Sequence, residues 1–340
     1  MPDRDPRSWM PAFAVGGLLF VGAAALIWAV LWFFDGVNIE TSERQAAPAV
    51  VVAQPPRIVA LSPALAIALR DLDLQDRIVG RHAYDMILDK SVPVCGDQLS
   101  VDYEALIAAA PTHVLMQRRD QEVPQRLKDL AASRGWKLVN APTLTLGEIR
   151  QTVRQLAAEF SAVDLDSLRP KADATPTDPR VLRAFLRIKD RMDHAWASPV
   201  PSTQPAGPRI LLLESLDPRA AHGPGSFHHE LLLAVGGRPV ITTGKPYITL
   251  DAEDVLRLAP EAIVIFAPRP YGSPPRATPP TPAELGALLG RLGTLDLPAI
   301  REHRIAIIDD PCCLLPSTAM IDTADELRRV IAAWQLPPHP

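Results

Sequence analysis

The chain reads Asp102-Tyr-Glu104-Ala-Leu-Ile-Ala-Ala-Ala-Pro111-Thr-His-Val-Leu-Met116 and, 149 positions later, Asp251-Ala-Glu253-Asp-Val-Leu-Arg-Leu-Ala-Pro260-Glu-Ala-Ile-Val-Ile265. In both copies an aspartate that can cap a helix stands two residues before a glutamate, and a proline that cannot continue the helix follows. Each copy ends in a short apolar run, typical of a strand that is buried on both faces of a parallel sheet. A repeat this widely spaced predicts two similar α/β lobes, because solenoid repeats recur every ~20 to 50 residues.

Length and composition agree with two lobes. The 340 residues are enough for two domains, and a content of 47% apolar and 22% charged residues is ordinary for a globular protein. The net charge of −4 gives no electrostatic basis for binding nucleic acid. Cys95, Cys312 and Cys313 do not make a disulfide framework, since adjacent cysteines rarely pair. We expect all three to be small packing residues.

The N-terminal segment carries no charged residue from Trp9 to Phe34, a run longer than the ~20 residues that cross a bilayer. We interpret residues 1–34 as a transmembrane anchor. Arg4 and Arg7 precede the apolar run and Asp35 follows it, so the positive-inside rule places the N-terminus in the cytoplasm. The alternative is a cleaved signal sequence, although no small-residue cleavage site follows promptly. Either segment makes the globular part extracytoplasmic.

Beyond the anchor, predicted strands and helices alternate, which indicates parallel βαβ units. We therefore predict an α/β fold with two Rossmann-like lobes, each with a parallel sheet, joined by a single long helix. The predicted layout is a linker at 35–55, an N-terminal lobe at 56–160, a linker with the connecting helix (179–197) at 161–207, and a C-terminal lobe at 208–336.

Short apolar runs in the sequence predict the positions of the strands in the two lobes. The expected strands lie at 57–61, 77–80, 92–94, 114–116 and 137–139 in the first lobe, and at 210–214, 262–266 and 304–308 in the second. In the connecting helix, apolar residues from Leu182 to Trp196 recur every three or four positions and form one stripe. The seven prolines between positions 268 and 282 indicate a surface insertion.

Three further motifs occur in a fixed order. They are Arg57-Ile-Val-Ala-Leu-Ser-Pro63 with Leu74-Gln-Asp-Arg-Ile-Val-Gly80, the Val101-Asp-Tyr-Glu104 copy of the repeat, and Gly223-Pro-Gly-Ser-Phe227 with Leu231-Leu-Leu-Ala-Val-Gly-Gly237. With the two lobes and the connecting helix, this order resembles the helical-backbone, or class III, solute-binding proteins of ABC importers that handle cobalamin, haem and ferric siderophores. The resemblance covers most of residues 56–334.

The resemblance implies a role for the two repeated glutamates. In the cobalamin-binding members, one exposed glutamate per lobe docks onto arginines of the membrane permease, and Glu104 and Glu253 match those positions. The alternative is that both carboxylates only favour the positive end of a helix dipole, which requires no partner. The implied partners are an ABC permease and its ATPase.

The ligand is expected between the lobes, at the loops beyond the carboxyl ends of the strands. We single out eight residues there as candidates for ligand binding: His82, Tyr84, Arg118, Arg119, Phe227, His228, Tyr247 and Arg269. Other expected cleft residues are Ser62, Gly96, Asp97, Gln117, Glu214, His222, Ser226 and the loop 310–314.

The ligand class stays open at this point. Histidine and tyrosine, at His82, Tyr84 and His228 or His229, could ligate haem iron or another metal chelate. Alternatively, the arginines with Lys245 could bind carboxylates or catecholates of a siderophore. A cobalamin pocket would depend on the rings of Tyr84, Tyr103, Phe227 and Tyr247.

The sequence thus predicts a membrane-tethered, monomeric solute-binding protein that captures an iron or cobalt chelate and has no resident cofactor. An enzyme is disfavoured, because the segment around Ser226 lacks the Gly-x-Ser-x-Gly elbow and no phosphate loop or zinc spacing occurs. The alternative function is a membrane-anchored sensor or scaffold of the same fold that does not transport.

Overall fold

The computed structural model describes residues 55–97, 100–118, 123–170, 178–197, 207–216, 219–276, 278 and 280–335. The chain divides into two units, Met1–Val52 and Ala53–Pro340, and the described residues belong to the second. The predicted transmembrane anchor and nearly all of the linker that follows it lie outside the described residues. Among the helices of the described part, none is long and apolar enough to cross a membrane.

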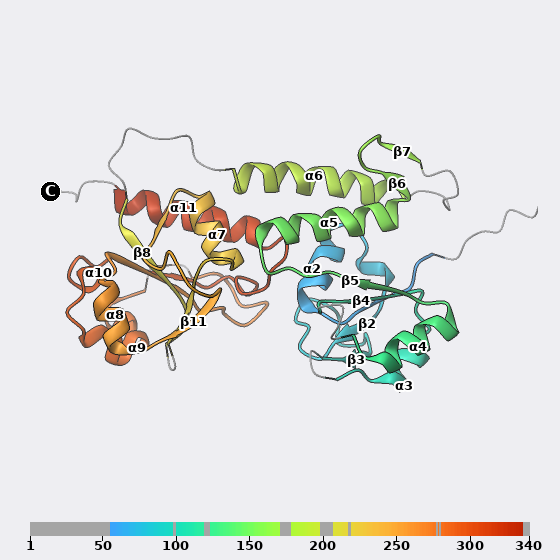
Figure 1. Ribbon diagram of the computed structural model, residues 1–340, viewed down its shortest axis with the longest axis horizontal. Helices are drawn as coiled ribbons and strands as arrows, with labels where there is room; N and C mark the ends of the chain where they lie inside the picture. The colour runs from blue at the N-terminus through green and yellow to red at the C-terminus, as the bar shows by residue number, and fades with distance from the viewer. Residues whose placement is uncertain are drawn as a thin grey trace, which may run out of the picture. The chain divides into compact units, whose positions relative to one another are not determined.

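The N-terminal lobe is built on a parallel sheet, as predicted (Figure 1). Its strands are β1 (Ile58–Ala60), β2 (Ile78–His82), β3 (Val94–Gly96), β4 (His113–Met116) and β5 (Lys137–Asn140), in the order β3-β2-β1-β4-β5. The connecting elements are α2 (Pro63–Asp71), the short 3-10 helix η1 (Gln75–Arg77), α3 (Tyr103–Ala109), α4 (Gln125–Arg134) and α5 (Leu146–Ser161).

Alternating strand residues of this sheet enter two different cores. Ile58 and Leu115 pack in a cluster with the apolar faces of α2 and α5. Val59 and Val114 pack on the opposite face, with residues of α3 and α4. Both faces are therefore covered, which explains why these strands read as continuous apolar runs.

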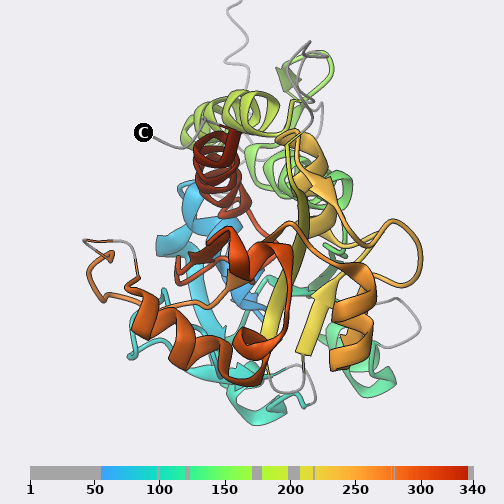
Figure 2. The same cartoon turned by 90° about the vertical axis from the view of Figure 1, so that its left-hand side faces the viewer.

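The connection between the lobes contains the predicted helix, α6 (Pro179–Ala195), capped by the side chain of Asp178. It is preceded by a two-stranded antiparallel ribbon, β6 (Val163–Asp164) with β7 (Arg169–Pro170), in the part of the chain predicted to be a linker. Helix α6 contacts α5 of the first lobe and α11 (Met320–Gln335) of the second. Figures 1 and 2 both show the yellow-green helix α6 beside the red helix α11.

The C-terminal lobe differs from the prediction, because its sheet is mixed rather than parallel. The strands are β8 (Arg209–Leu216), β9 (Arg219–His222), β10 (Arg238–Pro239), β11 (Tyr247–Leu250), β12 (Ala262–Phe266) and β13 (Ile305–Ile308), with the path β11-β9-β8-β12-β13 and β10 beside β8. Strands β9 and β8 are antiparallel, as are β11 and β9. Only two residues separate β8 from β9, a connection that allows a hairpin but no parallel crossover.

The helices of the second lobe are α7 (Phe227–Ala234), α8 (Ala252–Leu258), α9 (Pro282–Leu289), a 3-10 turn η3 (Gly290–Thr294), α10 (Pro298–Arg301) and α11. As in the first lobe, alternating residues of the central strands enter two cores: Ile210 and Val264 pack with α7 and α11, whereas Leu211 and Ile263 pack with α8 and α9. All three cysteines are free and buried, which confirms their assignment as packing residues.

The repeat seen in the sequence has the same geometry in both lobes. Ile58 of β1 pairs with His113 of β4, and Ile210 of β8 pairs with Ala262 of β12, the residue 149 positions after His113. An arginine precedes Ile58 in the first lobe and Ile210 in the second. Arg57 donates to the carbonyls of Ala109 and Ala110 at 2.7 and 3.0 Å, and Arg209 donates to the carbonyl of Leu258 at 3.0 Å. Each arginine thus binds the carboxyl end of the repeated helix, α3 or α8.

Candidate functional site

A cavity of about 730 Å³ lies between the lobes, at the carboxyl ends of the parallel strands. The first lobe contributes strand-end and loop residues: Ser62, Pro63, Ala64, His82, Tyr84, Met86, Asp97, Gln117, Arg118, Pro142, Thr143 and Leu144. The second lobe contributes Phe227, Tyr247, Leu314, Leu315 and Pro316. The volume of the cavity is within the ~300 to 1,000 Å³ usual for small-molecule sites.

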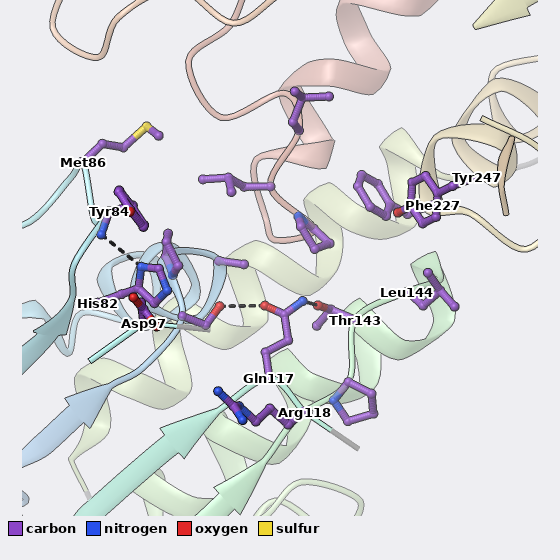
Figure 3. A pocket seen from close by; sticks show the side chains of 17 residues that line it. His82, Tyr84, Met86, Asp97, Gln117, Arg118, Thr143, Leu144, Phe227 and Tyr247 are labelled. Carbon is purple, nitrogen blue, oxygen red and sulfur yellow. Dashed lines mark hydrogen bonds between the residues drawn. The ribbon is translucent and has the colours of Figure 1, made fainter. Parts of the chain in front are cut away.

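Three polar side chains at adjacent strand ends form the floor of the cavity (Figure 3). The Ser62 hydroxyl, after β1, donates to the Gln117 carbonyl oxygen at 2.6 Å, and the Gln117 amide, after β4, donates to the hydroxyl of Thr143, after β5. Parallel strands end at one edge of the sheet, which brings these three residues together. Because these three side chains are hydrogen-bonded to one another, they present a fixed pattern of hydrogen-bond donors and acceptors to a ligand.

One wall is formed by the loop after β2. Buried Asp85 accepts hydrogen bonds from the backbone N–H groups of Ile87 and Leu88, at 3.0 and 2.8 Å, and thereby fixes a tight turn. Tyr84 and Met86 flank this turn and project into the cavity (Figure 3). The ring of Tyr84 is 75% exposed, so it is available to a ligand.

His82 lies behind Tyr84 and is 3% exposed. Burial lowers its pKa, although the charges of Asp97 and Asp85 oppose the shift, so the imidazole is neutral at pH 7. Its Nδ1 accepts the backbone N–H of Tyr84 at 3.1 Å, which leaves the proton on Nε2. Nε2 has no hydrogen-bond partner among the described residues. In this tautomer Nε2 carries the proton and has no lone pair for a metal, and the atom is buried among the described residues.

The opposite wall is aromatic and comes from the second lobe. Phe227 is the first residue of α7, whose N-cap Ser226 accepts the backbone N–H of His229. Tyr247 begins β11, directly opposite His222 of β9. Burial raises the pKa of Tyr247, and the nearby Glu214 adds to the shift, so the phenol keeps its proton. Figure 3 shows Phe227 and Tyr247 across the cavity from Tyr84 and His82.

No protein-family model and no curated protein matches this sequence. Solved structures do match. The periplasmic vitamin B12 binding protein BtuF of Vibrio cholerae superposes with a TM-score of 0.59 at 17% identity, over 83% of this chain and 98% of that one. A periplasmic haem-binding protein of Pseudomonas aeruginosa gives 0.60 at 20% identity, over 84% and 96%. IsdE of Staphylococcus aureus, complexed with haem, gives 0.57 at 19% identity, over 82% and 99%.

The chain has the class III solute-binding protein fold. This confirms the predicted architecture of two α/β lobes joined by a helix, apart from the mixed second sheet. Two of these neighbours are described as binding proteins, for vitamin B12 and for haem, and the third was solved in complex with haem. Within the described residues, no group of three or more histidine, cysteine, aspartate or glutamate side chains is placed to hold a metal ion.

Within this class III fold, five of the eight candidate residues line the cavity: His82, Tyr84, Arg118, Phe227 and Tyr247. Arg119 lies outside the described residues. Ser62, Asp97, Gln117 and Leu314, which the strand-end rule also placed there, line the cavity as well. Their contacts with a ligand remain predictions.

His228 is placed in the core rather than in the cleft, which corrects the prediction. Successive residues of a helix point about 100° apart, so Phe227 reaches the cavity while His228 faces inward. The His228 side chain is fully buried against Phe266, and its Nε2 lies 2.7 Å from the carbonyl oxygen of Cys313. It has no surface with which to touch a solute.

Arg269 is also placed elsewhere. Its guanidinium is held by Asp309, through the carboxylate at 3.1 Å and the backbone carbonyl at 3.0 Å, and by the carbonyl of Ser273. It lines a separate polar pocket of about 330 Å³ together with Tyr271 and Asp310. The strand-end rule gave its position just beyond β12, but could not show that Asp309, just beyond the neighbouring strand β13, binds its guanidinium.

Sequence reasoning missed several cavity residues, among them Met86, the segment 142–144, Leu315 and Pro316. Residues 142–144 follow β5, so the strand-end rule could have found them if it had been applied to that strand. Met86 depends on the turn around Asp85, which carries no simple sequence signal.

Glu104 and Glu253 occupy equivalent positions in the first turns of α3 and α8, and both are exposed. Asp102 accepts the backbone N–H groups of Glu104 and Ala105, and Asp251 accepts that of Asp254, so the aspartates are the caps. Neither glutamate side chain has a hydrogen bond or ion pair within the described part of the chain. Capping therefore leaves both carboxylates available, and docking remains a prediction.

Proposed function

We propose that this protein captures an iron or cobalt chelate, such as a ferric siderophore, haem or cobalamin, and delivers it to an ABC permease. The observation that carries the proposal is the cavity between the lobes, with aromatic rings on facing walls and a polar floor. Ligand sites in proteins usually combine apolar walls with a few fixed polar groups in this way.

The lining suits a flat or aromatic chelate that brings its own metal. Tyr84 on one wall and Phe227 with Tyr247 on the other offer ring faces, while Arg118 supplies a positive charge for carboxylates or catecholates. Cobalamin and haem are the ligands of the neighbours with this fold.

Delivery would take place outside the cytoplasm. The apolar run at 9–34 would tether the binding unit to the membrane, and Glu104 and Glu253 would dock one lobe each onto the permease, whose ATPase drives transport. The charge of both carboxylates is unpaired in the described residues, which supports a cationic partner.

The test is isothermal titration calorimetry. The full chain in detergent micelles is titrated separately with haem, cobalamin and a ferric siderophore, and the dissociation constant of each is measured. We expect one of the three to bind, and Tyr247→Ala to weaken that binding about tenfold because an aromatic wall is lost. Tyr271→Ala is the matched control, since Tyr271 is 48% exposed against 43% for Tyr247 but lines the other pocket.

Absence of binding for all three chelates would refute the proposal. Binding without any uptake by cells that carry the chain would favour the sensor or scaffold instead. Reversing both Glu104 and Glu253 to lysine should abolish uptake and leave the dissociation constant unchanged, and normal uptake would remove the docking role.

A further inference from the structure

Each repeated helix exposes an aliphatic side chain at the same position. Ile107 of α3 is 38% exposed and Leu256 of α8 is 44% exposed, and they are 149 positions apart, the spacing of the repeat itself. Single exposed leucines are common on protein surfaces and mean nothing alone. Here the same exposed apolar position occurs in both lobes.

Neither side chain has a packing role in its own lobe. The preceding residues, Leu106 and Val255, are completely buried and belong to the cores of the two lobes. Ile107 and Leu256 pack against none of the apolar clusters formed by the described residues. Helix propensity gives no reason for Ile107, because isoleucine is a weaker helix former than lysine or glutamate.

Both aliphatic residues stand three positions after the exposed glutamates. Residues three and four apart lie on one face of a helix, so Glu104 shares its face with Ile107, and Glu253 shares its face with Leu256. The exposed Arg257, four after Glu253, is already paired with Asp254 at 3.1 Å. Each repeated helix therefore presents an exposed glutamate, with no ion pair among the described residues, and an exposed apolar side chain on the same face.

We propose that Ile107 and Leu256 are apolar contact residues of the permease-docking surface, one beside each glutamate. The inference rests on the proposed function. The partner would be a permease of two equivalent halves, each with a cationic side chain next to an apolar socket. The carboxylates select a cationic partner, and the duplication selects one that presents the same site twice. Burying the aliphatic side chains would supply affinity, while the charges orient the encounter.

The test uses the full chain in its own membranes, with a benzophenone amino acid in place of the exposed Ala108 of α3. Illumination should yield a covalent adduct with an integral permease subunit, identified by mass spectrometry, and needs no knowledge of the chelate. In this background the double variant Ile107→Gln with Leu256→Gln should lower the adduct yield about tenfold. The swap Ile107→Leu with Leu256→Ile should retain it.

The matched control is Leu186→Gln with Leu233→Gln, on α6 and α7. These leucines are 40% and 48% exposed, so the chemistry and exposure match while the surface differs. The control should leave the adduct yield unchanged. Thermal midpoints of all variants should agree within about 2 °C, since exposed substitutions of this kind change stability little.

The outcomes separate the inference from the proposed function. If Glu104→Lys with Glu253→Lys loses the adduct while the glutamine variant keeps it, the apolar contact is wrong and the docking proposal stands. If the parent chain gives no permease adduct, the proposed function itself fails. An adduct with a second copy of this chain would overturn the assignment of the surface to a permease.

Discussion

At the scale of single residues, the most unusual feature is a pair of buried imidazoles behind the aromatic wall of the cleft. The rings of His222 and His228 lie 4.0 Å apart. Burial lowers the pKa of His222 to about 4, and burial together with the neighbouring His222 keeps the pKa of His228 well below its usual value. Glu214, whose pKa burial raises, lies 3.7 Å from His222. Because His222 is neutral at pH 7, the two do not form an ion pair there.

This pair predicts that the protein loses stability in mild acid. The unfolded histidine takes up a proton below its ordinary pKa of ~6.5, whereas folded His222 does so only near pH 4, so the free energy of unfolding falls as pH drops through this window. For His222 alone the loss between pH 7 and pH 5 is about 2 kcal/mol. Urea titrations at the two pH values measure it. His222→Phe should reduce the loss, whereas the exposed control His194→Gln should not; equal losses would contradict the assignment.

The residue scale also shows what the sequence could and could not predict about the site. The rule that ligands bind beyond the carboxyl ends of parallel strands identified Ser62, Gln117 and Tyr84, because it needs only the positions of the strands. It failed for His228, since a loop position does not determine which face of the following helix points to the cleft. The pairing of Arg269 with Asp309 likewise joins two loops that are distant in sequence.

At the scale of elements, each repeated helix is held at its carboxyl end by the arginine described above. The last carbonyls of a helix lack hydrogen-bond partners within the helix, and they form the negative end of the helix dipole. A guanidinium at this end donates hydrogen bonds to the carbonyls and places a positive charge beside the dipole. We expect Arg57→Ala and Arg209→Ala each to lower the free energy of unfolding by ~1 to 2 kcal/mol, and the effects to add because the sites lie in different lobes. Urea midpoints measure this. The exposed Arg183→Ala on α6 is the control, and an equal loss there would refute the role.

Element prediction succeeded where the signals were local. Capping aspartates, a proline at the helix start or end and apolar periodicity placed α3, α6 and α8 within a few residues of their observed bounds. It missed β9, β10 and β11, which are short and depend on pairing with β8 or with each other. A strand such as β10, two residues long, has no periodicity to detect, so the mixed sheet of the second lobe could not be foreseen.

At the scale of the whole binding unit, the two lobes share one continuous core. A single apolar cluster runs from Ile58 of β1 through α5, α6 and α7 to Ile331 of α11. Polar contacts cross between the lobes as well: Glu230 of α7 accepts the first N–H of α5, from Leu146, at 2.8 Å, and the Thr318 hydroxyl donates to Asp71 of α2 at 2.5 Å. Separating the lobes would expose the cluster to water, so neither lobe is expected to unfold alone.

This shared core predicts one cooperative unfolding transition. In a fragment that begins at Ala53, variants that keep only Trp136 of the first lobe or only Trp334 of the second report on the two lobes separately. Both should give the same urea midpoint, because a two-state transition looks identical to every probe. Glu230→Ala removes a charged acceptor at the N-terminus of α5. It should lower both midpoints equally, through a loss of ~1 to 2 kcal/mol in the free energy of unfolding. Different midpoints, or a shift confined to Trp334, would mean that the lobes unfold independently and that α6 is a tether rather than part of the core.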